Sequence, residues 1–158
     1  MKIMIGNDHA GYKLKLILIR HLDTKPGIVV VDAGSHSEER VPYPLYAAKV
    51  AEAVALGEVD RGILICATGI GISIVANRYK GIRAALCTST YMGKMARAHN
   101  DSNLLCLGGR VTGYAEALDI LDAWLDTPYD EGRHEASLAM IGRIDNGESL
   151  EIEELYTP

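Results

Sequence analysis

The sequence predicts an α/β fold in which helices cover both faces of a five-stranded parallel sheet. Short apolar runs rich in Ile, Val and Leu alternate along the chain with segments of helical periodicity. The apolar runs show little alternation between polar and apolar residues, as expected when both faces of a strand are covered. The 158 residues suffice for one domain with its own core. The predicted architecture is a three-layer αβα sandwich with a Rossmann-like sheet.

Each predicted strand is a short apolar run bounded by polar or glycine residues. The five runs occupy residues 2–6, 28–32, 62–66, 82–86 and 104–107. All are of ordinary strand length, and the segments between them are long enough for a crossover helix. Consecutive strands are therefore expected to run parallel.

Helical periodicity follows each strand. The predicted helices occupy residues 10–22, 43–56, 71–79, 90–98, 113–125 and 133–144. In the fifth, the apolar residues from Ala117 to Leu125 recur at helical spacing, so one face should be buried. Gly57 stands where a C-terminal glycine ends the second helix, and Thr112 is expected to cap the fifth.

The composition argues against some classes of partner and indicates the cellular compartment. The net charge of −5 argues against a nucleic-acid-binding protein, and no apolar stretch approaches the roughly 20 residues of a membrane span. The N-terminus lacks the features of a signal peptide. The three cysteines are odd in number and form no C-x-x-C pair, which favours reduced thiols in a cytoplasmic protein. The last segment, 145–158, reads as an acidic tail that lies on a surface or on a partner subunit.

Ligands of open parallel sheets bind at the carboxyl ends of the strands, and polar residues gather there in this chain. Asp8 and His9 follow the first strand, Cys66 ends the third, and Gly109-Arg110 follow the fifth. No His, Asp, Glu or Cys grouping has metal-ligand spacing along the sequence, so no metal is expected.

The segment around Cys66 carries most of the chemical information. A strand ends at this cysteine, and the small residues Ala67 to Gly71 turn the chain into the next helix. Amides at a helix N-terminus attract an anion, and a thiol in that position has a lowered pKa. The turn lacks the Lys of a phosphate-binding P-loop and the full G-x-G-x-x-G of a dinucleotide site. A buried structural cysteine is the competing interpretation.

Other candidate residues have structural alternatives of similar weight. His9 is either a hydrogen-bonded structural histidine or a site residue. His99 ends a helix, where a cation also interacts favourably with the dipole, and Asn100 could be a left-handed helix terminator. Arg110 and Arg133 could both be surface arginines. Tyr43, between two prolines, is expected to pack, while His36 and His134 have no supporting context.

Taken together, several ordered segments resemble the ribose-5-phosphate isomerase B family, which also holds the galactose-6-phosphate isomerase subunits. The resemblance covers about residues 1–142. It rests on the matching segments 6–15, 41–44, 60–77, 81–85, 99–103, 109–111 and 132–134. It implies a sugar-phosphate isomerase domain over residues 1–144 that works without metal or cofactor.

The resemblance implies an aldose–ketose isomerase of the pentose phosphate pathway that interconverts ribose 5-phosphate and ribulose 5-phosphate. Cys66 would move a proton between C2 and C1 through a cis-enediolate. Thr68 and His99 would assist ring opening, with His99 as the proton donor, and Asp8 would bind sugar hydroxyls.

The same resemblance assigns the residues that bind the substrate. The enediolate oxygen would be held by the Asn100 side chain and the turn amides of Gly69 to Ser73. The residues of the turn that would bind the substrate are Ala67, Thr68, Gly69, Ile70, Gly71 and Ser73. The phosphate would be held by His9, Arg110 and Arg133. Family members are dimers or tetramers with the active site at the subunit interface, where His99, Asn100 and Arg110 would come from the partner.

Two departures from the family bear on the substrate. The family usually has Gly at the position of Ala67, so the turn is expected to be tighter or stiffer. A second arginine commonly follows Arg133 by one helical turn, where this chain has Ser137. The loss of one charge-assisted contact would weaken phosphate binding by about 1.5–3 kcal/mol. The alternatives that remain are a hexose 6-phosphate (allose or galactose) isomerase and a noncatalytic sugar-phosphate-binding module.

Overall fold

Five parallel strands form the centre of the molecule in a computed structural model that describes residues 1–151. The strands are β1 (Lys2–Asn7), β2 (Val29–Gly34), β3 (Arg61–Cys66), β4 (Ala84–Leu86) and β5 (Leu104–Gly108). Their order in the sheet is β2-β1-β3-β5-β4, so β5 lies between β3 and β4. The predicted parallel sheet is confirmed, and its order places the ends of β1, β3 and β5 side by side.

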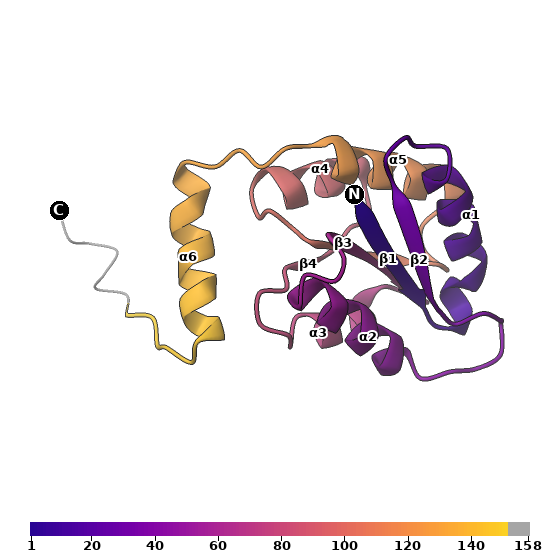
Figure 1. Ribbon diagram of the computed structural model, residues 1–158, viewed down its shortest axis with the longest axis horizontal. Helices are drawn as coiled ribbons and strands as arrows, with labels where there is room; N and C mark the ends of the chain where they lie inside the picture. The colour runs from indigo at the N-terminus through magenta and orange to yellow at the C-terminus, as the bar shows by residue number, and fades with distance from the viewer. Residues whose placement is uncertain (152–158) are drawn as a thin grey trace.

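Helices cover both faces of this sheet (Figure 1). One face packs against α1 (Tyr12–Leu22), α4 (Thr90–Ala98) and α5 (Tyr114–Asp126), and the other against α2 (Tyr43–Ala55) and α3 (Ile70–Ala76). The apolar stripe of α5 explains its position, because Ala117, Leu121 and Trp124 have no exposed surface. The three-layer sandwich predicted from the sequence is confirmed.

The last helix is unlike the others. Helix α6 (Arg133–Asp145) has no buried residue and stands beside the β4 edge of the sheet, away from the three layers (Figure 1). It contacts the body at its C-terminal end, where the Gly81 amide donates to Asp145 Oδ2 at 2.7 Å. Ile141 and Ile144 on it are 38% and 56% exposed. This helix leaves apolar surface uncovered in the single chain.

Several details of the sequence prediction are wrong. The third helix ends at Ala76 rather than at residue 79, because the amides of Arg78 and Tyr79 turn back onto carbonyls three residues earlier. Thr112 does not cap α5, whose N-cap is Gly113, and the Thr112 hydroxyl is buried without a hydrogen-bond partner. The left-handed residue after α4 is Asp101, at φ 42°, and not Asn100.

Two further predictions concern the chain's surroundings. No helix among residues 1–151 is long and apolar enough to cross a bilayer. The predicted acidic tail 145–158 falls mostly outside the described residues; in its described part, Arg143 Nε forms an ion pair with Glu148 at 2.9 Å.

Candidate active site

Asp8 lies at the carboxyl end of β1, where a short 3₁₀ helix, η1 (His9–Gly11), begins. Its carboxylate oxygen Oδ1 accepts the amides of Ala10 at 2.8 Å and Gly11 at 3.2 Å. The side chain therefore caps η1 and is held in one orientation. Only 5% of Asp8 is exposed, and it lines a hollow of about 470 Å³ together with His9 and residues 40–44.

Cys66 lies at the carboxyl end of β3 and is 5% exposed. The Gly69 amide donates to its sulfur at 3.1 Å. Gly69 adopts φ 80°, and a Cβ there would lie 2.4 Å from Leu86 Cδ1. Only glycine tolerates both the positive φ and the close approach of Leu86 without strain, which explains why the turn has a glycine at position 69. The turn holds the cysteine side chain against the first turn of α3.

The amides of this turn are not equally available to a ligand. The Gly69 amide bonds to Cys66, the Ile70 amide to Thr68 Oγ1 at 3.3 Å, and the Ser73 amide to the Gly69 carbonyl at 3.2 Å. Gly71 and Ile72 lie in the first turn of α3, where amides lack a partner within the helix. These two amides are the best candidates in the turn to hold an anionic oxygen.

The departure at Ala67 causes no backbone strain. Among the described residues, the only non-glycine positions with positive φ are Asp101 and Glu131. Ala67 therefore adopts a conformation that any L-residue tolerates. The carbonyl of Ala67 accepts the Arg110 amide at 3.0 Å, and that of Cys66 accepts the Gly109 amide at 2.8 Å. These bonds join the loop after β5 to the cysteine turn.

His9 and Arg110 line a second hollow, of about 250 Å³, which also includes Lys13, Glu38 and Tyr114. The Nδ1 atom of His9 is buried without a hydrogen-bond partner. Such an atom costs free energy unless a ligand or water satisfies it. The hollow therefore offers an imidazole and a guanidinium to an anion. Lys13 is paired with Glu38 at 3.0 Å, and this carboxylate raises the Lys13 pKa by hydrogen bonding and by its charge.

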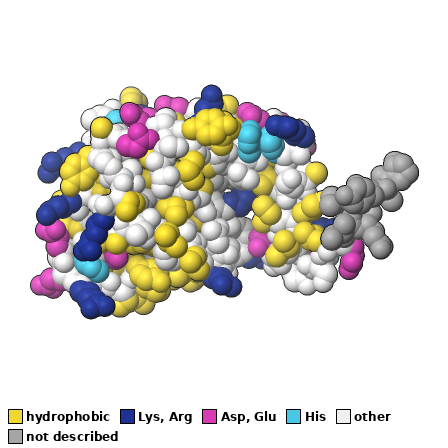
Figure 2. Space-filling model, turned by 180° about the vertical axis from the view of Figure 1, so that it is seen from behind, with side chains coloured by type: hydrophobic (Ala, Val, Ile, Leu, Met, Phe, Trp, Pro, Cys, Tyr) yellow, Lys and Arg dark blue, Asp and Glu magenta, His cyan; other side chains and the backbone are white. Residues whose placement is uncertain are grey.

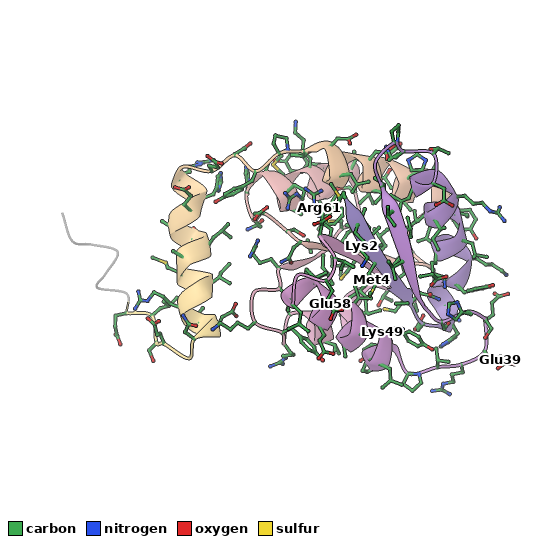
Figure 3. The ribbon with its side chains drawn as sticks, in the orientation of Figure 1. Lys2, Met4, Glu39, Lys49, Glu58 and Arg61 are labelled. Carbon is green, nitrogen blue, oxygen red and sulfur yellow. The ribbon has the colours of Figure 1, made fainter. Side chains whose placement is uncertain are left out.

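The loop over the first hollow is anchored by a buried lysine. Lys15 has no exposed surface, and its ammonium donates to Asp32 Oδ1 at 2.8 Å and to the Ser35 carbonyl at 2.6 Å. The lysine thus joins α1 to the end of β2, from which the loop 35–42 departs. Glu39 in this loop and Arg61 at the start of β3 lie at opposite ends of the sheet (Figure 3).

Tyr43 packs, as expected, but the sequence prediction missed that it packs on the cysteine turn. A Cβ on Gly71 would lie 2.8 Å from Tyr43 Cζ and 2.9 Å from its hydroxyl oxygen, so the tyrosine covers the turn. Tyr43 is 37% exposed and lines the larger hollow, as does Arg40. The contact joins segments 28 residues apart along the chain, and the two prolines around Tyr43 were the only available signal.

The structure does not bring every predicted residue to this edge. Helix α4 runs back across the sheet, so His99 and Asn100 at its end lie near the amino ends of the strands. Asn100 lines a hollow with Arg83 and Ala84 at the start of β4, and its carbonyl accepts from Arg83 Nε at 2.9 Å. The His99 ring stacks on that of His134, the neighbour of Arg133, with centroids 4.3 Å apart.

The predicted residues therefore form two groups separated by the length of a strand, roughly 17–20 Å. Asp8, His9, Cys66, Thr68 and Arg110 lie at the carboxyl edge. His99, Asn100 and Arg133 lie at the other. We expected Arg110 to come from a partner together with His99 and Asn100, but it lines one hollow with His9 of its own chain. Arg133, next to His134, belongs with the His99 group.

Comparison with known proteins adds independent information. The family model described as Ribose/Galactose Isomerase matches residues 3–141. The ribose-5-phosphate isomerase B of Escherichia coli strain K12 is 49% identical over 144 residues, which cover 91% of this chain and 96% of that protein.

Solved structures agree. The ribose-5-phosphate isomerase B of Clostridium thermocellum has a TM-score of 0.91 and 53% identity, over 94% of this chain and all of the other. That of Mycoplasma genitalium, solved with bound ribulose 5-phosphate, has a TM-score of 0.88 and 38% identity, over 92% and 96% of the two chains.

Proposed function

The chain belongs to the ribose/galactose isomerase family, and from this premise we propose that it interconverts ribose 5-phosphate and ribulose 5-phosphate, with Cys66 as the base. It is an aldose–ketose sugar-phosphate isomerase. The observation that carries the assignment of Cys66 is its position at the end of β3, held by the Gly69 amide beside the amides of Gly71 and Ile72. A thiolate base and oriented N–H donors are what an enediolate intermediate requires.

The reaction moves one hydrogen between carbons and one between oxygens. The Cys66 thiolate takes the proton from C2 of the open-chain aldose, which leaves a cis-enediolate. A proton passes from O2 to O1, and the resulting thiol gives a proton to C1, which yields the ketose and regenerates the thiolate. The negative oxygen is held by amides of the turn between Thr68 and Ser73, of which Gly71 and Ile72 are free to donate. One such donor is worth about 3 kcal/mol in comparable sites. Thr68, whose hydroxyl oxygen accepts the Ile70 amide within the turn, assists ring opening, and Asp8 binds the sugar hydroxyls.

The phosphate binds away from the reacting carbons. The hollow that His9 and Arg110 line supports this role, because it has a buried imidazole nitrogen without a partner and a guanidinium within one cavity. Binding energy from the phosphate orients the sugar over Cys66. No metal or organic cofactor enters this reaction.

The complete site requires two chains. His99 as proton donor, Asn100 as a ligand of the enediolate, and Arg133 as a phosphate ligand lie a strand length from Cys66 in their own chain. The uncovered apolar residues of α6 support a second copy as the partner, since Ile141 and Ile144 would be buried at such an interface. A homodimer, or a tetramer built from it, would bring His99 of one chain to Cys66 of the other.

A substrate panel tests the function. Purified protein is expected to turn over ribose 5-phosphate with a higher kcat/KM than allose 6-phosphate or galactose 6-phosphate. In deuterated water, substrate recovered before equilibrium should carry deuterium at C2. Binding of ribose 5-phosphate without exchange would mean a noncatalytic binding module. Activity lost to EDTA and restored by added metal would contradict the metal-free mechanism.

A hexose 6-phosphate is the second candidate substrate. The hollow of about 470 Å³ beside Asp8 and Tyr43 is also lined by Arg40 and Val41 of the loop that follows β2, where a longer sugar would be accommodated. A higher kcat/KM for allose or galactose 6-phosphate in the same panel would favour this candidate over the pentose.

A further inference from the structure

The junction between α4 and α6 gathers three side chains with metal-binding chemistry. One ligand atom each of His99, Asp130 and His134 lies within 4.8 Å of the other two. They come from the end of α4, the connecting segment and the first turn of α6. Because 35 residues separate the first from the last, their spacing along the sequence shows no metal motif. Figure 2 shows histidine side chains at the surface where α6 joins the body.

The backbone holds these three residues together. The Asp130 amide donates to the Ala98 carbonyl at 2.9 Å, directly beside His99. The His99 amide donates to the Met95 carbonyl at 3.0 Å, and the His134 amide to the Glu131 carbonyl at 3.3 Å. The two imidazole rings stack at 4.3 Å with an interplanar angle of 15°. Asp130 makes no ion pair within residues 1–151, so its carboxylate is available to a cation.

The ligand set fits one class of ion. Two imidazoles and one carboxylate suit Zn²⁺ and related divalent transition metals, whereas Mg²⁺ and Ca²⁺ prefer oxygen ligands only. Bonds of about 2.0–2.2 Å place ligands on a tetrahedral ion about 3.4 Å apart. Side-chain rotation must therefore bring ligand atoms that now lie up to 4.8 Å apart closer together by as much as about 1.4 Å. Three protein ligands leave the fourth position open to water.

We propose that His99, Asp130 and His134 bind a divalent transition-metal ion of the Zn²⁺ class, and that this ion inhibits the isomerase. The inhibitory part rests on the proposed function, in which His99 donates a proton to the substrate. A histidine nitrogen bound to a metal has no lone pair or proton for that transfer. The ion acts as an inhibitor, so the site is compatible with a metal-free reaction.

Metal binding is tested first, on the full chain in its native assembly. Zn²⁺ titrated against a chromophoric chelator is expected to bind at one ion per chain, and Mg²⁺ is not expected to compete. Co²⁺ at this site should give the visible absorption of a tetrahedral complex. His134→Asn and Asp130→Asn should each weaken Zn²⁺ binding about tenfold or more, since even the hydrogen-bond partners of metal ligands affect affinity about 10–100-fold.

His36→Asn is the matched control, because His36 is 72% exposed and belongs to the loop after β2. It should leave Zn²⁺ affinity unchanged. Wild-type affinity in both His134→Asn and Asp130→Asn, verified as folded by circular dichroism, would overturn the site. An equal loss in His36→Asn would show nonspecific binding to histidine and would also overturn it.

Inhibition is measured as the turnover at each Zn²⁺ concentration relative to the same variant without metal. Wild type should lose turnover as the site fills, and His134→Asn and Asp130→Asn should need about tenfold more Zn²⁺ for the same loss. Equal inhibition of all three proteins would place the inhibitory ion elsewhere, for example on Cys66, and would overturn the inhibitory role. If wild type turns over no sugar phosphate, the proposed function fails, and the binding titration still decides the metal site.

Discussion

At the scale of single residues, a hydrogen bond from the Gly69 backbone amide to the sulfur positions the Cys66 side chain. Replacing it with alanine removes the proposed base and leaves the turn backbone in place. Cys66→Ala is expected to lower kcat by about 10²–10⁴-fold, the usual contribution of a positioned base. The measurement is turnover of ribose 5-phosphate.

Cys66→Ser serves as the matched variant, since it keeps a polar atom of similar size that is far less acidic. Both variants should still bind the sugar phosphate, because His9 and Arg110 are unchanged. Wild-type turnover in Cys66→Ala would exclude this residue as the base.

Gly69 shows how much of the site depends on the backbone. Gly69→Ala is expected to destabilise the fold by about 1–2 kcal/mol for the left-handed backbone and by about 1–3 kcal/mol more for the contact with Leu86. Gly81→Ala is the control, because Gly81 has φ 77° but nothing within 4 Å of a new Cβ. Urea unfolding of both variants separates the two effects. Equal destabilisation would mean that the turn relaxes around the new methyl group.

At the scale of elements, the buried ammonium of Lys15 joins α1 to β2 and to the loop over the active site. Asp32→Asn is expected to cost up to about 3–5 kcal/mol of unfolding free energy, because the buried charge loses its counterion. It should also raise KM more than it lowers kcat, since the loop carries Arg40. Urea unfolding and steady-state kinetics check the two effects.

Lys13→Met is the control for Asp32→Asn. It removes the ion pair of Lys13 with Glu38, in which both side chains are more than half exposed, and little change in stability is expected. Equal stability losses in Lys13→Met and Asp32→Asn would contradict the special role of the buried lysine.

A second contact between elements has a pH signature. Burial raises the Asp122 pKa, but hydrogen bonds from Lys25 and His21 and their charges outweigh it and hold the pKa below its ordinary value of 3.8. The distances from Asp122 Oδ1 are 2.9 Å to Lys25 and 2.7 Å to His21. The lowered pKa stabilises the folded protein fully at pH values above 3.8, the pKa of Asp122 in the unfolded chain. The stabilisation is lost as the pH falls through the lower pKa that Asp122 has in the folded protein.

Urea unfolding from about pH 5 to about pH 3 is the measurement. Stability of the wild type should fall more steeply over this range than that of Asp122→Asn, which has no carboxyl to titrate. Parallel curves for the two proteins would show that Asp122 has the same pKa in the folded and unfolded states.

At the scale of the whole molecule, the separation of Cys66 from His99 predicts complementation between chains. If the proposed homodimer shares its sites, Cys66→Ala and His99→Asn should each turn over far more slowly than wild type as pure proteins. A mixed dimer would contain one site with an intact Cys66 and an intact His99. Mixing equal amounts under exchange conditions should restore up to about a quarter of wild-type activity, the share of sites that are complete in a C₂ dimer.

Size-exclusion chromatography provides the control, because it shows whether the subunits are dimeric and exchange. If verified mixed dimers remain inactive, both residues must act within one chain, and the shared-site proposal fails.

Much of this arrangement could be predicted from sequence because it depends on local patterns. The apolar run of 62–66 predicted a strand covered on both faces, and β3 occupies this segment. The helix predicted over 90–98 has the same first and last residues in the structure. The glycines after Cys66 indicated a tight turn into α3, since their conformational requirement is local to that turn. Thr112 failed as a cap because α5 begins one residue later than predicted, with Gly113 at the N-cap position.

Long-range relations could not be predicted in the same way. Tyr43 meets Gly71 only because α2 and α3 share one face of the sheet. His99, Asp130 and His134 meet because the segment after α5 crosses back to α4. Contacts of this kind depend on strand order and on how helices cross, for which local periodicity carries no signal.

By itself, the sequence determined the α/β class, the family resemblance and the cysteine turn, because hydrophobic period, glycine placement and ordered motifs are properties of the chain. Only the tertiary structure decided the strand order β2-β1-β3-β5-β4, the exposed position of α6 and the division of the site residues between two ends of the sheet. The physical reason is that burial is a property of the packed whole: α4 must run antiparallel to the strands to cover the sheet, and this carries His99 away from Cys66.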